Sequence, residues 1–466
     1  MRGLIMLLLL CAPAFGQWVE DPDALRRLPV DAQVRTLDSL ARLTVSRVTG
    51  STHALIRTED GALHRVSAAE AFLEWVIAPS RARDDPVLFV DALPLRRAID
   101  ERVAMSSMER DAYAAHGLLT PDAAVRVFEE VGGEAALTAS LARLEDRLLH
   151  FLQSRQSLDD ATRGVWVDLE QPWLSRDAAS LTAVVERMTG ASSWRTTLEL
   201  LRNDVPLSGV AAWSFVLAAI VLLLGPHAPW RMIGVGAYVL GLCAQVLSLA
   251  MRAVVAGRLP LQNQYESLAV LALLCAAVGG LWAVRARQPR IAIVGAGAAF
   301  CMLLMAEHAG VPGAAVEPEP AILATSSLLA YHVAIMLLAY GIIVIGGVLG
   351  GMALWRRARQ GDASELAPSV RTAMHLSFWT LGIGILLGAW WAERAWGRWW
   401  AFDAKETWAL ITWLVYLVGV HMPAAEGMSR VKREGWMAVL AILGLICMLW
   451  TYFGVNLLMN SLHAYA

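Results

Sequence analysis

Charged side chains are scarce in this sequence. Asp, Glu, Lys and Arg make up 17% of the 466 residues, whereas a soluble domain carries about 25%. Hydrophobic residues make up 57%, and the mean hydropathy is +0.50. This composition excludes a disordered chain, a coiled coil and an ordinary soluble enzyme, and it indicates a membrane protein with a soluble part. The formal net charge of −2 gives no electrostatic reason to expect nucleic-acid binding.

Cysteine is also scarce, and its five positions contain no CxxC pair. Cys11, Cys243, Cys275, Cys301 and Cys447 all lie in apolar runs, where cysteine serves as a packing residue. The spacing therefore offers no disulfide framework, no zinc site and no thiol redox motif. We infer that this chain does not itself reduce or exchange disulfides.

The first part of the chain differs in character from the rest. Residues 1–17 have one arginine, an apolar run and a small-residue end, which is typical of a secretory signal peptide; retention of this segment as an anchor is the alternative. Residues 18–205 mix charges of both signs with apolar residues at helical spacing, as in AALTASLARLEDRLLHFLQS. This pattern predicts a mostly helical, extracytoplasmic domain.

From residue 209 to 466, apolar stretches approach the ~20 residues that span a bilayer. We expect an all-α, polytopic membrane bundle of about eight spans. Their approximate ranges are 209–225, 231–250, 266–284, 291–308, 328–354, 375–393, 405–421 and 436–458.

The connectors between the spans predict the orientation. Connectors 285–290, 355–360 and 429–434 are basic, which marks the cytoplasmic side, whereas 309–321 has two Glu and no Lys or Arg. An exported N-terminal domain followed by eight spans leads to the same orientation. We therefore expect a protein of the inner (cytoplasmic) membrane with its N-terminal domain and C-terminus outside.

Tryptophan is concentrated near the C-terminus: seven of the 19 Trp fall between residues 390 and 413. An interfacial aromatic belt explains one or two Trp at each span end. The alternative is a platform for a large flat aromatic ligand, because indole faces stack on π-systems. Asp403 also fits a capping box with Glu406 at the start of a span, so capping is its first role and ligand contact its second. The aromatic members are Trp396, Trp399, Trp400, Phe402 and Trp408.

Histidine depths favour haem as that ligand. His332 lies about 23 residues before Trp355 along one predicted span, roughly 34 Å of helix, so it sits at the outer boundary. His463 follows the last span on the same side. Two imidazoles beside an aromatic plane suit bis-histidine haem ligation. His421 lies roughly 25 Å lower, near the cytoplasmic face, where a lone histidine is more simply an interfacial polar residue.

The run Trp396-Gly-Arg-Trp-Trp-Ala-Phe-Asp403-Ala-Lys-Glu-Thr-Trp408 resembles the tryptophan-rich WWD signature of haem-handling proteins. With segments 263–267, 330–336 and 454–465, it is most similar to CcsA/ResC-type cytochrome c assembly proteins of the system II pathway, over about residues 209–466. Two positions depart from the family pattern. Phe402 stands where Trp is usual, and Ala404 stands where Pro is usual.

The resemblance implies a function and a set of site residues. It implies binding of haem b, export, and presentation to an apocytochrome c CxxCH motif for thioether attachment. His332 and His463 match the external haem ligands, and His421 matches a transmembrane histidine that receives haem from inside with a ResB-type membrane subunit. Arg252 and Arg258 are candidates for pairing with haem propionates, with interfacial anchoring equally open. The alternatives are a membrane-bound b-type cytochrome, a system I-type haem-delivery protein and a plain transporter.

Overall fold

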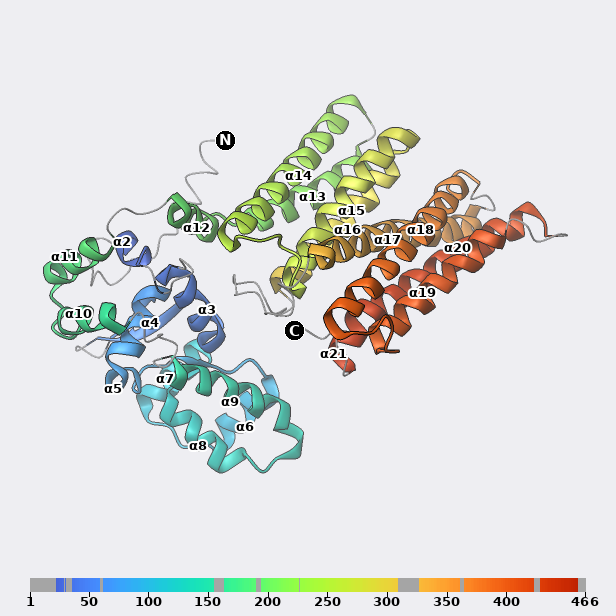
Figure 1. Ribbon diagram of the computed structural model, residues 1–466. Helices are drawn as coiled ribbons and strands as arrows, with labels where there is room; N and C mark the ends of the chain where they lie inside the picture. The colour runs from blue at the N-terminus through green and yellow to red at the C-terminus, as the bar shows by residue number, and fades with distance from the viewer. Residues whose placement is uncertain are drawn as a thin grey trace. The chain divides into compact units, whose positions relative to one another are not determined.

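The structure, a computed structural model, describes residues 22–28, 30, 36–58, 62–154, 163–189, 194–225, 227–308, 327–360, 364–422 and 428–459. The predicted signal peptide, 1–17, and His463 lie outside the described residues. The chain divides into two compact units, Met1–Asn203 and Asp204–Ala466. Figure 1 shows both units.

The N-terminal unit is mainly helical, with two short antiparallel strand pairs that the sequence pattern did not predict. Strand β1 (His53–Arg57) pairs with β2 (Leu63–Ser67), with Ala54 opposite Val66. Strand β3 (Leu88–Phe89) pairs with β4 (Leu118–Leu119). The helical segments are α2 (Pro22–Arg26), α3 (Leu37–Thr49), α4 (Ala68–Ile77), α5 (Pro79–Ala82), α6 (Leu93–Arg102), α7 (Ser107–His116), α8 (Pro121–Val131), the 3₁₀ turn η1 (Ala135–Leu137), α9 (Thr138–Gln153), α10 (Arg163–Leu174), α11 (Ala178–Thr189) and α12 (Trp194–Asp204).

Helix α4 is the centre of this unit. All its residues except Ile77 are buried, and Phe72 and Trp75 are among the largest fully buried side chains. A capping box starts the helix: the Ser67 hydroxyl oxygen accepts from the Glu70 N–H while the Glu70 carboxylate accepts from the Ser67 N–H. Trp173 on α10 donates to the Glu74 carboxylate at 2.7 Å, so a hydrophobic helix still anchors its neighbours through a buried polar contact.

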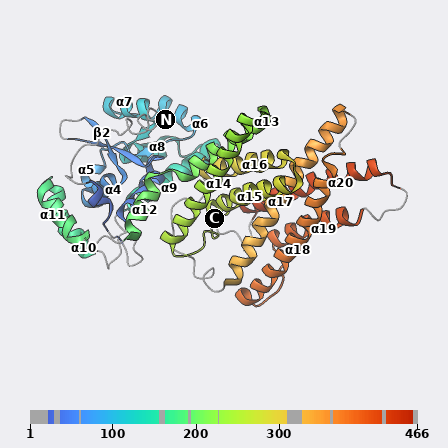
Figure 2. The ribbon, with the colours of Figure 1, turned by 90° about the horizontal axis from the view of Figure 1, so that it is seen from above.

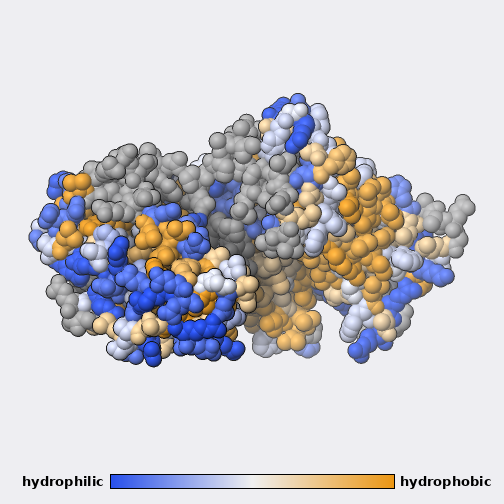
Figure 3. Space-filling model, turned by 90° about the horizontal axis from the view of Figure 1, so that it is seen from below, coloured by the Kyte–Doolittle hydropathy of each residue, from blue (hydrophilic) through white to orange (hydrophobic). Residues whose placement is uncertain are grey.

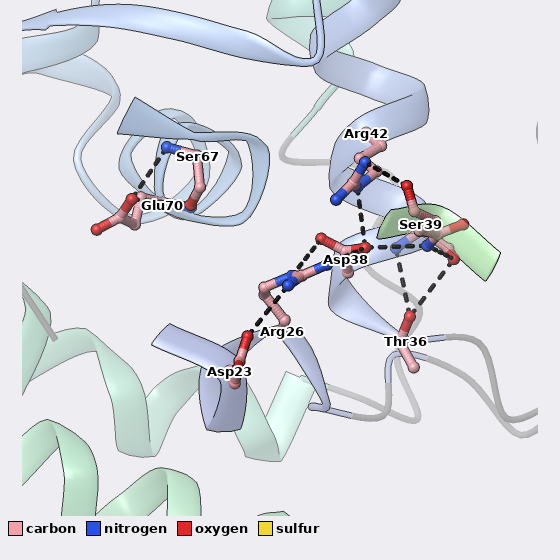
Figure 4. Close-up of polar contacts among 9 residues, drawn as sticks. Asp23, Arg26, Thr36, Asp38, Ser39, Arg42, Ser67 and Glu70 are labelled. Atoms are coloured by element: carbon pink, nitrogen blue, oxygen red, sulfur yellow. Dashed lines mark hydrogen bonds and ion pairs between the residues drawn. The ribbon is translucent and has the colours of Figure 1, made fainter. Parts of the chain in front are cut away.

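Asp38 joins three segments of the N-terminal unit (Figure 4). Its carboxylate accepts from Arg26 Nε on α2 and Arg42 Nε on α3, both at 2.9 Å, and from Asn203 Nδ2 on α12 at 2.9 Å. Burial alone would raise the pKa of Asp38, but the hydrogen bonds and charges of Arg26 and Arg42 hold it below its ordinary value. The buried carboxylate is therefore ionised and bridges helices far apart in sequence.

The C-terminal unit consists of long, apolar helices. Among the described residues, seven helices are long and apolar enough to cross a membrane. Helix α19 is the seventh of the eight predicted spans and falls short of that standard, because its first turn carries Lys405 and Glu406 and its end carries His421. The helices are α13 (Leu207–Leu224), α14 (Ala228–Ala256), α15 (Gln264–Ala286), α16 (Pro289–His308), α17 (Ser327–Gln360), α18 (Ala367–Trp396), α19 (Ala404–His421) and α20 (Arg430–Leu449), followed by a π-helical turn (Trp450–Gly454) and α21 (Val455–Leu458).

The exposed surface of this unit is hydrophobic, as a bilayer requires. Figure 3 shows a broad orange surface over its helices, whereas the described surface of the N-terminal unit is mostly blue. Leu224 is 74% exposed and Leu386 70% exposed, which would be unfavourable in water at this density of apolar groups. The predicted polytopic helical membrane fold is confirmed, and the protein passes through its membrane several times.

Two groups of helices make up the bundle (Figure 2). Helices α13 to α16 pack together, α17 packs with α18 and α20, and α15 and α16 join the two groups through α17. Helices α15 and α16 approach closely at Gly279 and Gly295: a Cβ on Gly279 would lie 2.8 Å from the Gly295 Cα. Small residues permit such backbone contact between membrane helices.

Polar contacts bring the three predicted basic connectors to one end of the bundle. Arg290 and Arg356 both pair with Glu365, which precedes α18. Arg357 donates to the backbone carbonyl of Val431 at the start of α20. The end of α15, the end of α17 and the starts of α16, α18 and α20 therefore meet at one level, and the opposite ends of these helices lie at the other.

Candidate functional site: a cavity at the non-basic end of the bundle

The C-terminal unit encloses a cavity of about 230 Å³. Its inner wall is apolar and consists mainly of α17, α18 and α19 side chains such as Val333, Ile385 and Ala409. Its polar residues come mostly from helix starts and from the segment before α15: Gln262, Asn263, Gln264, Lys405, Glu406 and Asn456. An apolar wall with a few polar groups is typical of small-molecule sites, which commonly measure ~300–1,000 Å³.

His332 lies on the second turn of α17 and lines this cavity. Its Nδ1 lies 2.8 Å from the backbone carbonyl oxygen of Gly384 on α18. A carbonyl oxygen can only accept, so Nδ1 carries the proton. The ring is thus the tautomer whose Nε2 has the lone pair suited to a metal, oriented by a backbone hydrogen bond.

Gly388 makes room for this imidazole. A Cβ at Gly388 would lie 2.5 Å from His332 Cε1 and 2.8 Å from Nδ1, distances that no real contact adopts. One helical turn farther along α17, Met336 lines the cavity at the level of Gly384. The spacing of four residues on both helices places His332 and Met336 on one face of α17, against the glycine side of α18.

The tryptophan-rich segment 396–408, here called the tryptophan loop, contributes one of its predicted aromatic residues to the cavity wall. Trp400 lines the cavity, as does Trp391 near the end of α18. Trp396 contacts Trp391 edge to face, with ring centroids 4.9 Å apart, so it supports the wall from behind. Trp408 packs against Trp450, with ring centroids 5.8 Å apart.

The same loop is shaped by the cap of α19. The predicted capping box is present: Asp403 accepts from the Lys405 N–H at 3.2 Å, and Glu406 accepts from the N–H groups of Ala401 and Asp403 at 2.8 and 3.3 Å. Phe402 has a φ of 54°, a left-handed conformation that costs free energy for a non-glycine residue. Its ring is 80% exposed and Trp399 is 58% exposed, so both point away from the cavity wall.

A buried ionic cluster holds the segment that precedes α15. The Glu266 carboxylate accepts from Arg252 at 2.9 Å, from Arg258 at 2.8 Å and from the Gln262 N–H at 2.9 Å. The Glu266 and Arg252 side chains are 0% and 2% exposed. Both arginines are therefore committed to a carboxylate of this chain, and neither lines the cavity. The cluster fixes the backbone on which Gln262 and Asn263 face the cavity.

The π-helical turn after α20 supplies the remaining wall. Thr451, Tyr452 and Asn456 line the cavity from this turn and from α21. Tyr452 shares a short hydrogen bond with Ser267 on α15. The irregular turn allows several polar side chains to face inward at a helix end, a setting in which π-turns often serve function.

His421 lies at the far end of α19 from the cavity. It is exposed, its Nδ1 lies 2.8 Å from the Leu417 carbonyl oxygen, and 17 residues of helix separate it from Ala404, roughly 25 Å. His463 is outside the described residues, so no distance joins it to His332. No group of three His, Cys, Asp or Glu residues that could hold a bare metal ion occurs among the described residues.

The structure brings to the cavity several residues that had no role in the sequence analysis: Trp391, Lys405, Gln262, Asn263, Tyr452 and Asn456. Asn263 and Asn456 lie within the segments that carry the family resemblance. That resemblance was the one signal in the sequence that could have identified Asn263 and Asn456, because no spacing rule brings the start of α15 and the end of α20 together.

Fold and cavity together define a multi-pass helical membrane protein with a largely apolar cavity beside an oriented imidazole. Residues 261–463 match the family model described as Cytochrome C assembly protein. The chain is 30% identical over 311 residues to the "Cytochrome c biogenesis protein CcsA" of Prochlorococcus marinus (strain MIT 9303), covering 57% of this chain and 94% of that protein. It is 33% identical over 231 residues to the CcsA protein of Chlamydomonas reinhardtii, covering 47% of this chain and 64% of that protein.

The chain belongs to the CcsA family of cytochrome c biogenesis proteins. The predicted family is confirmed, and with it a role in cytochrome c biogenesis. A membrane-bound electron-carrying cytochrome, one of the alternatives from the sequence, is not favoured. The match to the family model begins at residue 261, which lies beyond the N-terminal unit.

Proposed function

We propose that this chain binds haem b in the cavity beside His332 and presents it on the outer side of the inner membrane to an apocytochrome c. The observation that carries the proposal is the His332 ring, which lines an apolar cavity with its Nδ1 proton held by Gly384. An imidazole oriented in this way is the form in which histidine ligates haem iron. Trp400 in the same wall supplies an aromatic face for a porphyrin.

The proposed site needs a second axial ligand, and His463 is our choice for it. Haem supplies the vinyl groups that cysteine thiols of a CxxCH motif attack. This chain's part is to hold the ring in one orientation and to exclude water from one face through Val333, Met336 and Ala409. In this view the chain is a subunit of a holocytochrome c synthase, and the attacking thiols belong to its substrate.

The remaining predicted residues have supporting roles in this proposal. Trp396 braces the cavity wall through Trp391, and Trp408 packs against Trp450 at the start of the π-helical turn. Trp399 and Phe402, which are exposed, form the face on which an apocytochrome docks, and Asp403 holds the start of α19. His421 receives haem on the cytoplasmic side. Its exposure at a helix end is consistent with a site completed by another chain.

The orientation in this proposal follows from the two ends of the bundle. Arg290, Arg356 and Arg357 gather at one end, and basic connectors face the cytoplasm. The cavity lies at the other end, at the starts of α15, α17 and α19. A reporter fused after residue 466 should be active outside and one inserted at 361–363 inside. The reverse pattern would refute the orientation and with it an outward-facing cavity.

The absorption spectrum of the purified full chain tests the haem site. We expect a low-spin haem spectrum, since paired imidazoles give a strong ligand field. His332→Gly should weaken it, and added imidazole should restore it. His308→Gly is a matched control, because His308 is exposed at the end of α16 and does not line the cavity. An unchanged spectrum in His332→Gly would refute the site.

We further propose a ResB-type membrane subunit as the partner at the cytoplasmic side. One exposed imidazole holds iron loosely, whereas two fix it, so His421 needs a mate. Coexpression with that subunit should raise haem occupancy and cytochrome c maturation, and His421→Ala should cancel the gain. Full maturation by this chain alone, in a host without other assembly systems, would refute the need for a partner.

A further inference from the structure

Lysine is almost absent from this chain. Of its 39 basic residues only two are lysines, Lys405 and Lys432. Lys432 lies on the exposed first turn of α20, at the basic end of the bundle. Lys405 lines the cavity. The cavity therefore contains a compact ammonium group in a protein that otherwise uses the larger guanidinium.

The other charged residues near the cavity hold parts of the fold. Glu406 accepts from two backbone N–H groups and Asp403 accepts from the Lys405 N–H, so both carboxylates hold the helix start. Arg252 and Arg258 are paired with Glu266 and do not line the cavity. Among the described lining residues, Lys405 is the one lysine or arginine.

The surroundings of Lys405 favour a strong interaction with an anion. Its side chain is half-buried, and Ala409 one turn along α19 and Val333 on α17 line the same cavity. Removing an ammonium from water costs free energy, and an ion pair in an apolar wall is screened less than one at the surface. An anionic group on a ligand in this cavity would therefore interact strongly with the Lys405 ammonium.

We propose that Lys405 binds a carboxylate on the edge of the cavity's ligand, which under the proposed function is a haem propionate. A bond from His332 to iron fixes one axis but leaves the ring able to rotate about it. A second contact off that axis removes the rotation and so selects which ring edge faces the incoming thiols. Lys405 is thus a positioning residue, and its role rests on the proposed haem site.

Two lysines in one chain permit a direct footprinting test. The purified full chain, with and without haem, is treated with an amine-reactive acetylating reagent and the modification of each lysine is measured by mass spectrometry. Haem should lower acetylation of Lys405 at least several-fold and leave Lys432 unchanged as an internal control. Equal acetylation of Lys405 with and without bound haem would overturn the proposal.

Affinity measurements separate a carboxylate contact from a general effect on cavity shape. Lys405→Met should weaken haem binding about tenfold or more, as expected for a charge-assisted hydrogen bond. It should leave the affinity for haem dimethyl ester, which lacks free carboxylates, unchanged. Lys405→Arg should retain most haem affinity, and Lys432→Met should match the wild type.

The possible results are distinct. Equal weakening of haem and its dimethyl ester by Lys405→Met would show that Lys405 shapes the cavity and would overturn the carboxylate contact. Loss of haem binding in His332→Gly together with normal haem binding in Lys405→Met would also overturn the carboxylate contact, while leaving the proposed function intact. Failure of the wild-type chain to bind either compound would refute the proposed function itself.

Discussion

Gly388→Ala is a one-carbon perturbation aimed at the candidate haem ligand. The added Cβ would lie 2.5 Å from His332 Cε1, 2.8 Å from Nδ1 and 3.3 Å from Nε2. Carbon contacts are ordinary at about 3.5 Å or more, so the ring must retreat by about 1 Å. That movement stretches the 2.8 Å hydrogen bond to Gly384 toward or beyond its limit.

The expected cost follows from overpacking. Inserting a methyl group into a filled interior costs about 1–3 kcal/mol, which corresponds to about 5- to 150-fold in haem affinity if the bound state bears it. Helix propensity acts in the opposite direction, because Ala favours a helix over Gly by about 1 kcal/mol. A loss of haem binding therefore could not be ascribed to a weaker α18.

Haem titration of the full chain in detergent measures the effect. Gly388→Ala should lower affinity and shift the spectrum toward high spin, and free imidazole should restore the low-spin form. Gly351→Ala is the control, since Gly351 lies on α17 with His332 and a Cβ there meets nothing within 4 Å. If Gly388→Ala binds haem with unchanged affinity and spectrum, the His332 site is not where haem binds.

Three further substitutions test polar contacts within the N-terminal unit and within the C-terminal unit. Burial raises the pKa of Asp85 to about 7, although a backbone hydrogen bond from Arg57 acts in the opposite direction. Between about pH 4 and 7 the folded state therefore retains a proton that the unfolded state releases, so stability falls as pH rises through that range. Asp85→Asn should remove this pH dependence and stabilise the chain on the order of 3 kcal/mol at pH 8, measured by thermal unfolding. Asp38→Ala should destabilise the N-terminal unit by about 1–3 kcal/mol, because the partly buried guanidinium groups of Arg26 and Arg42 lose a charged acceptor; an unfolding temperature equal to wild type would contradict this. Glu266→Ala should lower both thermal stability and haem affinity, because it releases the segment that carries Gln262; unchanged haem affinity in the folded variant would separate that segment from the site.

The membrane fold could be predicted from sequence because hydropathy is a local property. Each of the eight apolar stretches is a helix, and the structure extends several of them, as from 375–393 to Ala367–Trp396. The strands of the N-terminal unit could not be predicted in the same way. Strands β3 and β4 are two residues long, and only their pairing, with Leu88 opposite Leu119, identifies them.

The candidate site could be predicted only where it depends on position along one helix. His332 was expected at a helix end from its distance to Trp355, and the unbroken α17 satisfies that expectation. Arg252 and Arg258 were candidates for ligand contact or for interfacial anchoring, and nothing in the sequence indicated that Glu266 would accept from both. Partners that come from separate helices are set by packing, and periodicity contains no information about them.

The two ends of the C-terminal bundle have different chemistry, and this difference is the strongest structural argument for directional function. At one end, arginines from separate connectors share Glu365, so several helix ends are tied together. At the other end, the contacts are an ionic cluster around Glu266, a helix cap at Asp403 and aromatic rings around a cavity. Under the proposed orientation, a ligand that enters from the cytoplasmic side would travel the length of α19 between His421 and Lys405, roughly 25 Å. Under the proposed function, the cavity end would bind the ligand while the other end ties the helices together, which suits transfer toward the cavity.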